Sequence, residues 1–151
     1  MIKMAKVNYY GKYRAIVQRV NDPEKRGRIR VSCPKVLGKA LSNWCEPCIP
    51  VAYDNGGDFM LPRIGEAIWV EFEEGDVNKP VYTGGWWSSN KTPSDNYSPK
   101  VRHKEWNGCK IKMQGADNDV GELIEIAVGN CKVSLTPDSV KIVTPKGTQE
   151  F

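Results

Sequence analysis

The stretch from Phe59 to Trp87 reads FMLPRIGEAIWVEFEEGDVNKPVYTGGWW, and its middle part decides the fold. Ile68, Val70 and Phe72 alternate with Trp and Glu, which is the period of a β-strand with one buried face. A Gly-Asp-Val-Asn turn then leads into a second extended run at 80–83. The two runs predict an antiparallel hairpin whose apolar face lies against a core.

Three further β-segments are expected before this hairpin. Residues 11–20 are rich in β-branched and aromatic side chains and stop at an Asn-Asp-Pro turn signal. In residues 28–33, polar and apolar side chains alternate strictly, as in a strand with one buried face. Three of them are expected to point inward, Ile29, Val31 and Cys33, and three outward, Arg28, Arg30 and Ser32. Residues 44–51 predict a short irregular strand, because each residue before a proline is extended, and 53–58 predict a loop.

Five strands with no convincing helix, spread over about eighty residues, predict an all-β domain, and the five-stranded OB barrel is the natural candidate. The hydrophobic share of 40% is sufficient for a core. No apolar run reaches the roughly 18 residues of a membrane span, and the first residues lack the apolar part of a signal peptide. We therefore expect a protein that is made and kept in a cytosol, or released by lysis.

The chain has a net charge of +4, unevenly distributed. Residues 1–30 hold nine Lys or Arg and two Asp or Glu, whereas 61–90 hold two and five. This asymmetry suggests charge-complementary contacts between copies or with a partner, and ordinary solvated faces explain it equally well. Five cysteines, an odd number, favour free thiols in a reducing compartment.

The composition changes after the hairpin. Residues 88–99 are polar and turn-forming, and short alternating segments follow at 109–113, 124–128, 131–135 and 140–142. Residues 107–113 resemble 129–135, twenty-two positions later, which indicates stacked β units. Each unit has too few apolar side chains for a core of its own, so its strands need partners. We predict a barrel at 1–87, a linker at 88–106 and a short intertwined β-strand spike at 107–151.

Trp44-Cys45-Glu46-Pro47-Cys48 matches the thioredoxin motif except at Glu46. Pro50 and the Gly56-Gly57 pair that follow argue against the helix that lowers the pKa of the first thiol in that family, so a redox site is not expected. Zinc binding with Cys33 would need a second pair, and Cys45 and Cys48 point to opposite faces of a strand. Packing thiols are favoured, with a metal or a disulfide at these two cysteines left open.

Other patterns for chemistry are weak. Glu71, Glu73, Glu74 and Asp76 predict a solvated strand face, because no partner acid of a glycosidase can be identified. His103, the single histidine, is expected on the surface. No nucleophile–base arrangement or phosphate-binding glycine loop is present. We assign no catalytic residue, cofactor or metal ligand and expect no enzymatic activity.

Binding of single-stranded nucleic acid is the alternative function, because OB barrels bind such strands on the face of their second and third strands. Arg28 and Arg30 would supply charge there. Trp44 is the only aromatic residue expected on that face, so stacking is not supported and no nucleic-acid partner is assigned.

Many positions between Tyr13 and Trp87 resemble, in order and spacing, the N-terminal OB domain of contractile-injection spike proteins. The matching positions are Asp22-Pro23, Gly27-Arg28-Ile29-Arg30-Val31, Pro34, Trp44, Pro50, Phe59-Met60-Leu61-Pro62, Gly65, Val70-Glu71-Phe72-Glu73, Gly75-Asp76, Lys79-Pro80-Val81 and Gly84. That family includes the cell-puncturing spikes of contractile-tailed phages, the baseplate assembly protein V group and the valine-glycine-repeat proteins of type VI secretion. The C-terminal segments are similar in style to its trimeric β-helix or β-prism needle.

The resemblance implies a homotrimeric structural spike that caps a tail tube, adapts it to a baseplate hub and helps to puncture a target cell envelope by transient contact. It implies residence in a virion or an extracellular injection particle, after assembly in a bacterial cytoplasm. No lysozyme domain fits between Ser88 and Trp106, and one histidine excludes the His-x-His iron site of some family tips. The needle is short, which implies a tip-capping protein. The predicted trimer core consists of Cys109, Ile111, Met113, Ile126, Cys131, Val133, Leu135 and Ile142.

Overall fold

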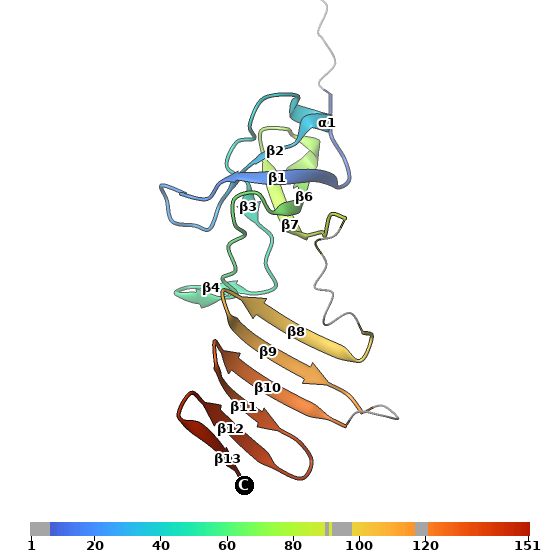
Figure 1. Ribbon diagram of the computed structural model, residues 1–151. Coiled ribbons are helices and arrows are strands. Elements are labelled where there is room, and N and C mark those ends of the chain that lie inside the picture. The colour runs from blue at the N-terminus through green and yellow to red at the C-terminus, as the bar shows by residue number, and fades with distance from the viewer. Residues whose placement is uncertain (1–6, 90, 92–97, 117–120) are drawn as a thin grey trace, which may run out of the picture. The chain divides into compact units, whose positions relative to one another are not determined.

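The computed structural model describes residues 7–89, 91, 98–116 and 121–151. It divides into two units, Met1–Lys91 and Thr92–Phe151, and strands dominate both (Figure 1). Among the residues described, no helix is both long and apolar enough to cross a membrane. The all-β prediction is confirmed.

The first unit is a five-stranded barrel. Its strands are β1 (Tyr13–Arg19), β2 (Arg30–Ser32), β3 (Glu46–Pro47), β6 (Ala67–Phe72) and β7 (Pro80–Gly85). They hydrogen-bond in the order β2-β1-β6-β7-β3, and only the β3–β7 pair is parallel. Two bonds close the ring between its ends: the Cys45 N–H donates to the Ile29 carbonyl (2.7 Å), and the Ile29 N–H donates to the Cys45 carbonyl (3.2 Å). This is the OB topology that the sequence predicted.

The hairpin that opened the sequence analysis forms as predicted. β6 pairs antiparallel with β7, and the inward side chains Ile68, Val70 and Phe72 are 2%, 0% and 5% exposed. The turn between them begins with a 3-10 turn, η1 (Glu73–Gly75). Gly75 has φ +75°, and a Cβ there would lie 2.9 Å from the Cβ of Asn8. Only glycine fits this position, because the turn packs directly under the chain that enters β1.

The barrel core combines the inward residues of β1, β2, β6 and β7 with neighbouring residues of the chain, among them Cys45, which directly precedes β3. Its buried apolar members are Ala15, Val17, Ile29, Val31, Cys33, Cys45, Ile68, Val70, Phe72 and Tyr82. Three aromatic rings, those of Tyr9, Tyr13 and Phe72, pack against one another at centroid distances of 5.7 to 6.3 Å and extend this core. The alternation predicted for 28–33 is confirmed for its inward residues, since Ile29, Val31 and Cys33 are fully buried.

Two short elements differ from the sequence prediction. A single helical turn, α1 (Pro34–Leu37), follows β2, and its proline stands at the first position, where its fixed φ suits a helix. Residues 53–58, predicted as a loop, contain most of a small hairpin of β4 (Ala52–Tyr53) and β5 (Gly56–Gly57). Asn55, with φ +63°, makes the tight turn between these strands, and the Asn-Gly pair is the signal that the prediction overlooked.

The second unit is one antiparallel meander in which each strand pairs with the next (Figure 1). Its strands are β8 (Val101–Trp106), β9 (Cys109–Gln114), β10 (Leu123–Val128), β11 (Cys131–Leu135), β12 (Val140–Thr144) and β13 (Gly147–Glu150). β8 occupies the end of the 88–106 segment that the sequence assigned to a linker. Most side chains of β8 are charged or polar, so its sequence lacks the apolar alternation by which the other strands were predicted.

Candidate interaction surfaces

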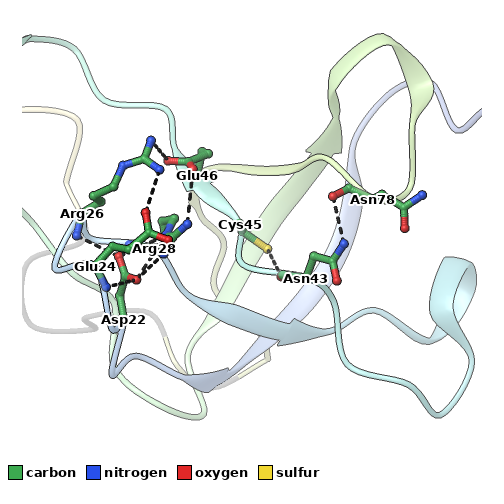
Figure 2. A network of polar contacts seen from close by, with 8 residues as sticks. All are labelled: Asp22, Glu24, Arg26, Arg28, Asn43, Cys45, Glu46 and Asn78. Atoms are coloured by element: carbon green, nitrogen blue, oxygen red, sulfur yellow. Dashed lines mark hydrogen bonds and ion pairs between the residues drawn. The ribbon is translucent and has the colours of Figure 1, made fainter.

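A buried ion-pair network fixes the connection between β1 and β2 (Figure 2). The guanidinium of Arg28 donates to Asp22 from Nη2 (2.7 Å) and Nε (3.1 Å), and the backbone N–H groups of Glu24 and Arg26 donate to the same carboxylate (3.0 and 2.8 Å). Only 10% of the Arg28 side chain and 3% of the Asp22 side chain are exposed. Arg28 Nη2 also contacts Glu24 Oε1 at 2.9 Å, and its Cζ lies 5.9 Å from the Trp44 ring centroid.

The network corrects one prediction. Arg28 was expected to be a free outward charge on the nucleic-acid face, but it is buried and neutralised. Its hydrogen bonds hold the pKa of the Asp22 carboxyl well below the usual range, and Asp22 in turn raises the pKa of Arg28. Asp22 and Arg28, which both belong to the positions that carry the family resemblance, therefore form one buried structural ion pair.

The same connection is tied to the far side of the barrel. The Tyr82 hydroxyl on β7 donates to the Gly27 carbonyl at 2.8 Å, and burial raises the pKa of Tyr82 to about 12. The Phe59 ring packs over Gly27, where a Cβ would lie 3.2 Å from the ring. Residues far apart in sequence thus hold the turn before β2 in one conformation.

The thiols of the first unit are placed for packing. Cys33 and Cys45 are fully buried, while Cys48 is exposed, as expected for opposite strand faces. Burial raises the pKa of Cys33, and it raises that of Cys45 to about 11. A thiol that is so difficult to ionise is a poor nucleophile for disulfide exchange. Within the described residues, no group of His, Cys, Asp and Glu side chains is arranged to hold a metal ion.

An aromatic and cationic surface lies elsewhere on the barrel. Arg14 Cζ lies 4.5 Å from the Trp86 ring centroid and 5.6 Å from that of Trp69. No sequence pattern predicted that these three side chains would be in contact. Beside them is a cavity of about 510 Å³, lined by Lys12, Tyr13, Arg14, Pro34, Lys35 and Trp69. The sequence analysis missed this surface because it examined β2 and β3, whereas Arg14 comes from β1, Trp69 from β6, and Trp86 directly follows β7.

The second unit presents a continuous apolar face. In a β-ladder, paired residues on neighbouring strands direct their side chains to the same side. One row of pairs joins Ile111, Ile126, Val133 and Ile142, the next joins Met113, Ile124, Leu135 and Val140, and the third joins Cys109, Val128 and Cys131. All eight residues predicted as a trimer core therefore lie on one face of one sheet.

This face, which we call the apolar face, is uncovered in the single chain. Eight of its side chains are 36–59% exposed: Ile111, Met113, Ile124, Ile126, Val128, Val133, Leu135 and Val140. Three of them, Ile124, Val128 and Val140, were absent from the sequence prediction. The same alternation that selected their neighbours would have found them, since each stands two positions from a predicted member.

The opposite face of the sheet is charged and internally paired. Lys132 Nζ contacts Glu125 Oε2 at 3.0 Å, and Lys141 Nζ contacts Glu150 Oε2 at 3.1 Å. The hydrogen bond from Lys132 lowers the pKa of Glu125. The sheet is thus amphipathic, with one face suited to water and the other to burial.

The comparison with known families covers the barrel. Residues 13–87 match the family model described as the Type VI secretion system/phage-baseplate injector OB domain. The match starts at the first residue of β1 and ends two residues after β7. No curated protein matches the chain.

Proposed function

Through residues 13–87 the chain belongs to the phage-baseplate and type VI secretion injector OB-domain family, and from this premise we propose that it is the trimeric spike of a contractile injection machine. The family gives it a structural role in such a machine, as a component of a virion or injection particle. The finer proposal is that three copies cap the tail tube and help to puncture the envelope of a target cell.

The observation that carries the trimer is the uncovered apolar face. A single-layered sheet has no core of its own, so its apolar side must pack against a second layer. Three copies around one axis can supply that layer for each other, each sheet covering parts of the other two. The predicted core, Cys109, Ile111, Met113, Ile126, Cys131, Val133, Leu135 and Ile142, is suited to this because its members already share a face.

In this proposal the barrels bind a baseplate hub protein, and the β13 end of the sheet is capped by a tip protein. β13 is an edge strand of the described sheet, so its outer backbone groups are available for pairing. The chain is assembled in a bacterial cytoplasm and contacts the target envelope only transiently. It transmits force and carries out no bond chemistry. An insulin-reduction assay with the reduced chain should therefore show no turnover at the Cys45-Cys48 motif.

The location test uses intact particles. A short epitope tag is added after Phe151, and gold-labelled antibody is applied to purified particles for electron microscopy. We expect label at one end of the tail tube, and a matched tag on a sheath protein should label the whole tail. Label along the sheath, or particles that carry none of the tagged chain, would contradict the proposal.

Binding of single-stranded nucleic acid is the second candidate, and the Arg14, Trp69 and Trp86 surface is the observation that favours it. Titration of a fluorescent oligonucleotide at several salt concentrations separates the two. A nucleic-acid binder should bind at micromolar concentration or better with a steep salt slope, and Trp69→Ala should weaken that binding. A spike protein should show weak binding that Trp69→Ala leaves unchanged.

A further inference from the structure

β8 is the exception on the apolar face. Register places Arg102 beside Met113, Lys104 beside Ile111 and Trp106 beside Cys109. The three apolar rows of β9 to β12 therefore begin, on β8, with a guanidinium, an ammonium and an indole. The remaining positions of this face on β9–β13 carry no charged side chain.

Among the residues that the structure describes, neither cation has a carboxylate partner. The acidic residues in the strands of the second unit are Glu105, Glu125 and Glu150, and each pairs in register with a lysine of the opposite face. Arg102 Nη1 donates to two carbonyls of its own chain, those of Pro99 (2.6 Å) and Val101 (3.0 Å). Lys104 is exposed and forms no ion pair with any residue that the structure describes.

Assembly of the apolar face would concentrate these charges. Lys104 stands in the middle row of its strand, between Arg102 and Trp106, directly beside Ile111 of the core. When three sheets face one axis, the residues of the middle row are those nearest to that axis, and symmetry relates the three copies of each. Three ammonium groups and three guanidinium groups would then face one end of the core, with no counter-charge from the residues that the structure describes. Like charges brought together in this way oppose assembly unless an anion joins them.

We propose that the trimer binds a compact multivalent anion of the phosphate class at the β8 end of the apolar face. The three Lys104 ammonium groups surround the anion at the axis, and the three Arg102 guanidinium groups flank it. Tetrahedral oxyanions fit because they offer several oxygens to donors arranged around one axis, and because guanidinium and ammonium groups are the cations that bind phosphate. This site rests on the proposed trimer, since no single copy completes it.

The test measures the trimer dissociation constant of the full chain by sedimentation. Inorganic tripolyphosphate at millimolar concentration is compared with sodium chloride of equal ionic strength. We expect tripolyphosphate to lower the trimer dissociation constant at least about tenfold, because a ligand that binds only the assembled state stabilises it by mass action. Inorganic phosphate should act in the same direction with a smaller effect.

Two variants assign the effect to the site. Lys104→Met should form trimers that no longer respond to tripolyphosphate and that are tighter than wild type in chloride alone. Lys110→Met is the matched control, because it removes the same charge from the adjacent strand on the opposite face, and its response should equal that of wild type. Trimers that respond equally in wild type and Lys104→Met would overturn the anion site while leaving the spike intact. A chain that stays monomeric in every salt would overturn the proposed trimer itself.

Discussion

Replacing Ile126 by Asp is the sharpest perturbation of the apolar face. Ile126 lies in the middle row between Ile111 and Val133, and half of its side chain is exposed in the single chain. Covering that half contributes about 1 kcal/mol per copy, since full burial of an isoleucine contributes about 1.5–3 kcal/mol. The carboxylate would add a desolvation cost of several kcal/mol with no partner on this face.

The total is at least about 3 kcal/mol per copy and at least about 9 kcal/mol per trimer, which is at least about six orders of magnitude in the trimer dissociation constant. Ala127→Asp is the matched control on the same strand. It directs an identical carboxylate to the opposite face, between Lys110 and Lys132. Sedimentation velocity over a range of concentrations should find monomers for Ile126→Asp and trimers for Ala127→Asp. Ile126→Asp trimers as tight as those of wild type would refute the assignment of this face to the interface.

Three other outcomes are expected. A chain ending at Trp87 should remain folded by circular dichroism and be monomeric, and trimers that survive this truncation would move the interface to the barrel. Tyr82→Phe should lower the free energy of unfolding in urea by about 1 kcal/mol, because the buried Gly27 carbonyl loses its donor, and an unchanged midpoint would show that water replaces the hydroxyl. The pKa of Asp22 is lower in the folded chain than its ordinary value of 3.8, so its pairing with Arg28 stabilises the fold above about pH 4, and this stabilisation is lost as the pH falls further. Below about pH 4 the melting temperature should therefore fall less steeply in Arg28→Met than in wild type. Parallel curves of melting temperature against pH would contradict the buried pair.

The barrel was predictable because its strands alternate cleanly. The period of two identified the inward face of β6 by Ile68, Val70 and Phe72, and that of β2 by Ile29 and Val31. Turn residues separate the two runs. The parallel pairing of Glu46–Pro47 with β7 left no comparable signal, since two residues are too few to show a period. The closing bond between Ile29 and Cys45 is likewise a consequence of barrel curvature and not of any local pattern.

The interaction surfaces were less accessible to sequence reasoning. Alternation placed Arg28 outside the apolar core, but it could not reveal the buried contacts that this side chain makes with Asp22 and Trp44. The stacking of Arg14 on Trp86 joins residues seventy-two positions apart, and only the fold brings them together. The apolar face was found because both of its determinants, strand period and short turns, are local.

The central claim is that three copies of this chain bury the apolar face against one another. Light scattering coupled to size-exclusion chromatography measures this directly, because one chain has a mass of 17.0 kDa. We predict a single species of three chain masses whose mass stays constant on dilution through the micromolar range. A stable species of one chain mass at every concentration would contradict the account.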